Sequence, residues 1–140
     1  FASDIPNKNF EFILKVLKKI NNPQLVTVIN PKEKIEEFKC VTTTNNEETM
    51  EILSQNEIYF HASEFETVGL PLYEAQDLGL KVVAPNNPYT QYFHKDSTFL
   101  YKSNDTEDAV EKIELASSTK TKNIRALDYS ENWGKVLSKI

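Results

Sequence analysis

Two glutamates flank a glycine turn in the middle of the chain. Glu66 and Glu74 are separated by seven residues, and Gly69, Leu70 and Pro71 lie between them. Pro71 suits the first turn of a helix, which places Glu66 in the preceding loop and Glu74 one turn into the helix. The free N–H groups at a helix N-terminus favour phosphate, and a glycine allows an anion to approach the backbone. Because carboxylates accept hydrogen bonds from hydroxyls, the motif predicts a site for a phosphate-bearing, hydroxyl-rich ligand.

Other phosphate and metal motifs are missing from the sequence. The chain has three glycines, Gly69, Gly79 and Gly134, so neither G-x-G-x-x-G nor G-x-x-x-x-G-K-[ST] can occur. No D-x-D triplet occurs, and the lone Cys40 excludes a cysteine-based zinc site. We therefore expect no metal ion and no other cofactor.

Strand-like and helix-like segments alternate along the chain and must position the motif. β-branched or apolar runs occupy residues 25–29, 41–44, 57–61, 81–84 and 98–101, and residues 1–3 resemble the end of a further strand whose beginning is missing. Helical spacing of apolar residues separates these runs, for example at Phe10, Ile13, Leu14 and Leu17. This alternation predicts an α/β fold, a Rossmann-like doubly wound parallel sheet of about six strands with helices on both faces. In such sheets ligands bind beyond the carboxyl ends of the strands.

Capping residues predict where several helices begin. Asn30 followed by Pro31 and Glu33 has the pattern of a helix N-terminus. Asn104 with Glu107 repeats that pattern, and Asn45 or the residue after it is expected to cap a helix through residues 50–53.

Length and composition describe one globular domain over residues 1–140. The chain is 39% hydrophobic and 26% charged, and no apolar run approaches the roughly 20 residues that span a bilayer. A net charge of −5, with Arg125 as the only arginine, argues against nucleic-acid binding. The single cysteine favours a reducing compartment such as the cytoplasm.

The stretch SEFETVGLPLYEA at 63–75, followed by LGLKVVA at 78–84, resembles the E-x7-E region of group 1 retaining glycosyltransferases, the family-4-like enzymes. Lys8 and Asn9 resemble the family's K-N segment. The sequence departs from the family pattern at three positions, where Thr67 replaces Gly, Ser3 replaces Arg and Lys81 replaces Pro. The resemblance implies the GT-B fold and identifies the chain as the C-terminal donor-binding half, a fragment without the acceptor-binding N-terminal domain.

The resemblance also implies a role for each matching residue. Glu66 would contact the donor sugar as the catalytic residue, and Glu74 would accept hydrogen bonds from the ribose. The backbone N–H groups of Gly69 and Leu70 would bind the diphosphate, and Lys8 would offset its charge. Two further residues, Thr43 and Thr44, would line the edge of the base pocket.

By the same resemblance, the parent enzyme would move a sugar from a nucleotide diphosphate sugar to a saccharide or lipid-linked acceptor, with retention. Such enzymes build polysaccharides or glycolipids in the cytoplasm or at the inner face of the membrane, with peripheral membrane association. The fragment alone would transfer nothing, because the acceptor site belongs mostly to the other domain.

Several alternatives stay open at the sequence level. The chain could be a non-catalytic flavodoxin-like or Rossmann-like binding module, or a scaffold. The two glutamates could be solvated surface groups or, less readily, a glycosidase acid/base pair. His61, at the end of a strand, is either an acid/base candidate or a structural histidine, and the structural interpretation is favoured.

Overall fold

The computed structural model describes residues 9–31, 33–64, 70–91 and 95–119. Four α-helices and five β-strands alternate in these ranges, together with three 3-10 turns at Pro23–Leu25, Pro88–Thr90 and Lys95–Ser97. The helices are α1 (Phe10–Leu17), α2 (Asn46–Ser54), α3 (Leu70–Asp77) and α4 (Thr106–Ser118). The strands are β1 (Thr27–Ile29), β2 (Lys39–Val41), β3 (Ile58–Phe60), β4 (Lys81–Pro85) and β5 (Thr98–Tyr101).

All strand pairs in the described residues are parallel. They form a two-stranded sheet, β1-β2, and a three-stranded sheet in the order β3-β4-β5. The prediction of a parallel sheet is confirmed, but the described residues contain five strands in two sheets, where about six strands in one sheet were expected. The strand end predicted at residues 1–3 lies outside the described residues.

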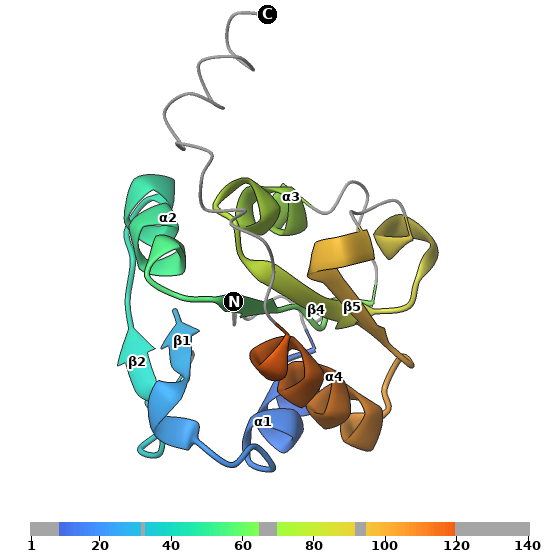
Figure 1. Ribbon diagram of the computed structural model, residues 1–140. Helices are drawn as coiled ribbons and strands as arrows, with labels where there is room; N and C mark the ends of the chain where they lie inside the picture. Colours follow the sequence, from blue (N-terminus) through green and yellow to red (C-terminus); the bar gives the residue numbers. More distant parts are fainter. Residues whose placement is uncertain (1–8, 32, 65–69, 92–94, 120–140) are drawn as a thin grey trace, which may run out of the picture.

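Helices cover both faces of the larger sheet (Figure 1). Val83 packs in a core with residues of α1 and α4, while its neighbours Val82 and Ala84 pack in a second core with residues of α2 and α3. This alternation follows from the two-residue period of a strand, and every residue of β4 is buried. The predicted doubly wound, Rossmann-like α/β class is therefore confirmed.

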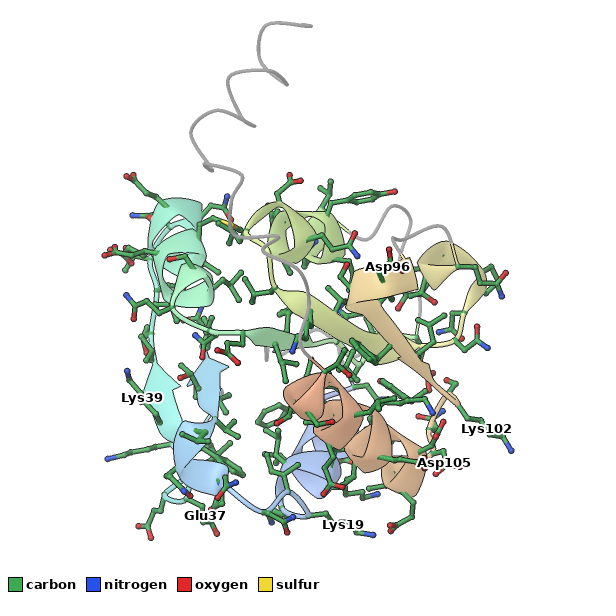
Figure 2. The ribbon with its side chains drawn as sticks, viewed as in Figure 1. Lys19, Glu37, Lys39, Asp96, Lys102 and Asp105 are labelled. Carbon is green, nitrogen blue, oxygen red and sulfur yellow. The ribbon has the colours of Figure 1, made fainter. Side chains whose placement is uncertain are left out.

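The capping predictions had mixed outcomes. Asn45 caps α2, as predicted, because its side-chain oxygen accepts from the Glu48 N–H at 2.9 Å. Asp105, labelled in Figure 2, caps α4 by accepting from the Asp108 N–H at 3.0 Å, so the predicted cap at Asn104 was wrong by one residue. Asn104 instead has a left-handed backbone with φ 60°.

The helix predicted after Asn30 does not form in the described residues 33–38. Asn30 has φ 50°, and its side chain is hydrogen-bonded to Thr43, which follows the neighbouring strand β2. A side chain engaged in that way cannot cap a helix, so a tertiary contact overrides the local signal.

Lys81 opens β4 in a buried position, 8% exposed. Its ammonium group donates to the Ala116 carbonyl at 2.6 Å and to the carbonyl of Thr119. Ala116 lies in the last turn of α4 and Thr119 is its C-cap residue, and carbonyls at a helix C-terminus lack partners within the helix. The lysine that replaces the family's proline therefore ties the end of α4 to the start of the central strand.

Within the described ranges, no helix is long and apolar enough to span a membrane. Cys40 is present as a free thiol.

Candidate functional site

Helix α3 carries Leu70 and Glu74, the two predicted ligand-binding residues of the motif that the structure describes. It follows β3 and therefore begins at the carboxyl edge of the larger sheet, with Leu70 as its first residue. Leu70 is 64% exposed. The first N–H groups of a helix have no intrahelical partner, so this end of α3 can receive an anion. Three other predicted residues, Lys8, Glu66 and Gly69, lie outside the described residues, as do Ser3 and Thr67.

Glu74 lies one helical turn after Leu70 and is half-buried. Burial raises the pKa of its carboxyl group, and the negative charge of Asp77 raises it further. Burial also raises the pKa of Asp77. A carboxylate that is partly removed from water at the start of a helix differs from an ordinary solvated surface group.

The exit loop, residues 61–64 after β3, is held by side chains from the loops and strands beside it. The hydroxyl of Tyr101 donates to the His61 carbonyl at 2.9 Å, and that of Tyr89 donates to the Ser63 carbonyl. The Asn87 amide donates to the Glu64 carbonyl at 3.1 Å. The chain that enters the motif is therefore fixed at three successive points.

Glu64 extends these contacts toward α1. Its carboxylate accepts from the Asn104 amide, and the Asn9 amide donates to the Asn104 side-chain oxygen at 3.1 Å. Asn9 and Asn104 have φ of 56° and 60°, a left-handed conformation that asparagine tolerates better than most residues. We define the exit-loop cluster as Asn9, Glu64, Asn87, Tyr89, Tyr101 and Asn104.

The interior of the exit-loop cluster is shielded from water. Tyr101 is 1% exposed, and burial raises the pKa of its hydroxyl well above the usual range, with the charges of Tyr89 and Glu64 contributing. His61 is also buried, and its Nδ1 lies 3.3 Å from the Tyr59 hydroxyl. The structural interpretation of His61 is therefore favoured over an acid/base role.

Thr43 and Thr44 lie at the carboxyl end of β2, beside the carboxyl end of β1. The Thr43 N–H donates to the Asn30 side chain at 2.7 Å, and its hydroxyl accepts from the Asn30 amide at 2.9 Å. The Thr43 hydroxyl also lies 2.8 Å from that of Thr49. The N–H and the hydroxyl of Thr43 thus have partners inside the protein.

Glu48 holds Thr44 in the same way. Its carboxylate accepts from the Thr44 N–H at 2.7 Å and from the Thr44 hydroxyl at 3.1 Å. The backbone hydrogen bond, followed by the hydroxyl bond, lowers the pKa of Glu48. We define the threonine cluster as Asn30, Thr43, Thr44, Asn45, Glu48 and Thr49.

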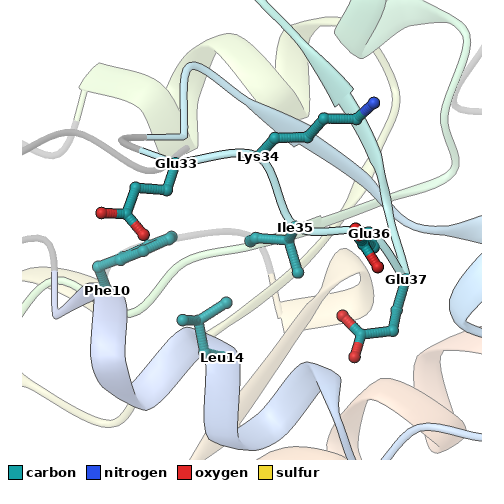
Figure 3. A pocket seen from close by; sticks show the side chains of 7 residues that line it. All are labelled: Phe10, Leu14, Glu33, Lys34, Ile35, Glu36 and Glu37. Atoms are coloured by element: carbon teal, nitrogen blue, oxygen red, sulfur yellow. The ribbon is translucent and has the colours of Figure 1, made fainter.

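A cavity of about 430 Å³ lies between α1 and the residues that follow β1 (Figure 3). Phe10, Leu14 and Ile35 form its apolar part, and Lys34 and acidic residues at 33, 36 and 37 border it. Helix α1 and helix α3 pack in different cores on opposite faces of the sheet. None of the residues that line this cavity belongs to the predicted motif.

No group of three or more His, Cys, Asp or Glu side chains suited to a metal ion occurs among the described residues. Sequence reasoning missed most of the exit-loop cluster, because its partners lie 23 to 95 positions apart. Two positions in the sequence could have indicated the cluster: Glu64 lies within the motif, and Asn9 lies beside Lys8.

The domain is Rossmann-like, because its strands are parallel and helices cover both faces of the larger sheet. An exposed helix N-terminus lies at the carboxyl edge of that sheet, where such domains bind their ligands. Residues 2–133 match the family described as glycosyl transferases group 1, and the chain belongs to this family. The predicted group 1 resemblance is therefore confirmed, and glycosyl transfer is the activity class of the family.

The fold also resembles a solved structure, the catalytic domain of cholesterol-alpha-glucosyltransferase from Helicobacter pylori. The TM-score is 0.64 over 99% of this chain and 94% of that one, at 21% sequence identity. At that identity the likeness concerns the fold alone. A comparison with curated proteins gives no match.

Proposed function

We propose that this domain binds a nucleotide diphosphate sugar at the carboxyl edge of its larger sheet. The proposal rests on the N-terminus of α3. In the sequence this helix follows Glu66 and Gly69, the first part of the glutamate–glycine motif, and half-buried Glu74 lies one turn inside the helix. As part of the full protein, the domain transfers the sugar to a saccharide or lipid-linked acceptor, with retention of the anomeric configuration.

The diphosphate binds the N–H groups of Gly69 and Leu70. A helix N-terminus favours an anion by roughly 0.3–1 kcal/mol, and more where the site is partly buried. Lys8 supplies a full positive charge to the same phosphates. These groups stabilise the charge that develops on the departing diphosphate, so the proposed mechanism needs no metal ion.

The two glutamates bind the hydroxyl groups of the donor. Glu66 contacts the sugar, and Glu74 accepts hydrogen bonds from the ribose, a task for the ionised carboxylate. Burial raises the pKa of Glu74, so its carboxylate becomes protonated at a higher pH than that of an exposed glutamate. As the pH is lowered, donor affinity is therefore expected to begin to fall earlier. Thr43 and Thr44 line the base pocket through their backbones and methyl groups, because their hydroxyls have internal partners.

Calorimetric titration with uridine, guanosine, adenosine and thymidine diphosphates tests the proposal. The 140-residue chain is expected to bind at least one of them, and Glu74→Ala is expected to weaken binding by about tenfold or more, the loss of a charged hydrogen bond. Glu111→Ala, an exposed glutamate on α4 at the opposite face, is the matched control. Absence of binding at millimolar concentration, or equal affinity in both variants, contradicts the proposal.

The acceptor and the metal requirement have separate tests. We propose a cytoplasmic enzyme in which a second domain supplies the acceptor site, so this chain binds donor without transferring sugar. Nucleotide affinity is expected to be the same in EDTA and in magnesium. A strict magnesium requirement would replace the metal-free mechanism with a metal-assisted one.

A further inference from the structure

Three segments that are far apart in the sequence meet at one exposed asparagine. Asn104 lies in the loop between β5 and α4, directly before Asp105, which Figure 2 labels. Its side-chain oxygen accepts from the Asn9 amide at 3.1 Å, and its own amide donates to the Glu64 carboxylate. Asn9 immediately precedes α1, and Glu64 belongs to the exit loop after β3. We call this series of hydrogen bonds, Asn9–Asn104–Glu64, the amide relay.

The chemistry of the three side chains gives the amide relay one direction. An ionised carboxylate can only accept, so Asn104 must offer its amide N–H group to Glu64. The oxygen of Asn104 is then left as the acceptor, and Asn9 must donate to it. An aspartate in place of Asn104 has the same size but no donor when it is ionised, so it could not make both bonds.

Asn9 takes part in the amide relay instead of capping its own helix. It is the N-cap residue of α1, and asparagine is preferred there because its side-chain oxygen accepts from the first turn. In this structure the Asn9 side chain makes no capping bond, and its backbone is left-handed with φ 56°. The usual local bond is thus replaced by one to a residue 95 positions away.

The loop that carries Asn104 is itself held against α4. The Lys102 N–H donates to the Asp108 carboxylate at 2.7 Å, and the Asp105 N–H donates to the Lys102 carbonyl at 3.0 Å. The Asp105 side chain in turn caps α4. Asn104 lies between these anchored residues, with φ 60°. It therefore holds Asn9 and Glu64 from a point that is fixed to the helix.

The two segments that the amide relay joins lead into the proposed donor site. Lys8 directly precedes Asn9, and Gly69 follows Glu64 by five positions. In the proposed function, Lys8 and the Gly69 N–H bind the same diphosphate from these two segments. A site that is already held in its binding geometry avoids the cost of ordering both segments when the ligand binds.

We propose that Asn104 is a positioning residue of the donor site. Through the amide relay it holds the start of α1 and the exit loop at one separation, so that both segments contact one diphosphate. Asn104 acts through Asn9 and Glu64 and does not touch the ligand. This inference rests on the proposed function. It predicts that loss of the relay weakens binding of nucleotide diphosphates more than binding of nucleosides, which have no phosphate.

Titration of Asn104→Gly tests the proposal. Glycine keeps the left-handed backbone and removes the relay without changing the net charge. The affinity for uridine, guanosine, adenosine or thymidine diphosphate, measured by calorimetry, is expected to fall about threefold to tenfold, the loss of one net hydrogen bond. The affinity for the matching nucleoside, measured by nuclear magnetic resonance titration, should stay unchanged. Ser103→Gly is the matched control, because Ser103 lies in the same loop and takes no part in the relay.

An exchange of the two polar groups tests the amide relay at constant net charge. Asn104→Asp alone places a carboxylate against that of Glu64 and should weaken diphosphate binding. When Asn104→Asp is combined with Glu64→Gln, the glutamine amide at position 64 can donate to the aspartate at position 104. That aspartate still accepts from Asn9, so the double variant should recover an affinity close to that of wild type.

The outcomes separate this inference from the proposed function. If wild type binds none of the four diphosphates, both are overturned. If wild type binds one of them and Asn104→Gly binds it equally well, only the positioning role is overturned. An equal loss of diphosphate and nucleoside affinity, or no recovery in the double variant, also overturns it, because Asn104 would then support the stability of the domain alone.

Discussion

The exit-loop cluster and the threonine cluster both hold loops at carboxyl ends of strands, but they do so over different distances in the sequence. Bonds in the exit-loop cluster join residues 23 to 95 positions apart. Bonds in the threonine cluster join residues 3 to 13 positions apart. The first cluster therefore exists only when the whole sheet has formed, whereas the second is a local structure with one link to the neighbouring strand.

This difference teaches which part of the site depends on the folded core. The exit loop enters the glutamate–glycine motif, so the geometry of the proposed donor site relies on contacts from β4, β5 and α1. The threonines depend mainly on the first turn of α2. The following variants separate the two clusters, in order of expected effect.

Tyr101→Phe is expected to have the largest effect. It removes one hydroxyl and leaves the buried His61 carbonyl without that donor, which costs about 1–3 kcal/mol of unfolding free energy. Urea denaturation measures the loss. Leu115→Ala is the control, because Leu115 is 48% exposed and its change should be within about 0.5 kcal/mol. Equal losses in the two variants would mean that the exit loop is not held from the core.

The same variant has a pH signature. The pKa of Tyr101 is raised in the folded protein, so the neutral hydroxyl contributes stability below the unfolded pKa of about 10, and this contribution is lost as pH rises above it. Wild type should therefore lose more stability than Tyr101→Phe between neutral pH and pH 11. Parallel stability curves for the two proteins would refute this role.

Asn30→Ala should have the next largest effect, on the threonine cluster. It removes two hydrogen bonds to Thr43 and places alanine at φ 50°, a left-handed conformation that asparagine tolerates better, and the total loss should be about 1–2 kcal/mol. Asn30→Gly loses the same bonds but accepts the left-handed backbone, so it should be less destabilising than Asn30→Ala. Thermal unfolding compares them, and the reverse order would exclude a conformational role for Asn30.

Asn104→Gly should have a smaller effect. It keeps the left-handed backbone and removes only the exposed side chain that links Asn9 to Glu64. We expect a loss below about 1 kcal/mol, with faster hydrogen exchange in the first turn of α1 and in residues 61–64. Exchange in α2 serves as the internal reference, and acceleration there as well would indicate general destabilisation.

Glu48→Gln should have the smallest effect, and the loss of stability should be confined to pH values at which the Glu48 carboxylate is ionised. The pKa of Glu48 is lowered in the folded protein, so its contribution is present above the ordinary pKa of 4.5 and is lost as pH falls through the folded value. The stability of wild type and variant should converge at acid pH. Exposed Glu51 provides the matched control in Glu51→Gln. A difference that persists below the folded pKa would contradict this assignment.

Sequence patterns predicted the structural features that are determined by residues close by in the sequence. The apolar run at β4 and the cap at Asn45 are local signals, and both were correct. The signal at Asn30 was also local, but Thr43, thirteen positions away, decided its conformation. The Asn9–Asn104 contact joins residues that are 95 positions apart, so no spacing rule could have predicted it.

The buried amine at the start of β4 has a practical consequence. Amine-reactive reagents attack a neutral, accessible amino group, and that of Lys81 is enclosed and shared between two carbonyls. Lys15 of α1 and Lys18, the C-cap residue of that helix, are exposed and should be acylated quickly. Lys81 should resist until the last turn of α4 opens. The rate of Lys81 acylation, followed by mass spectrometry, would thus report how often that end of the helix opens.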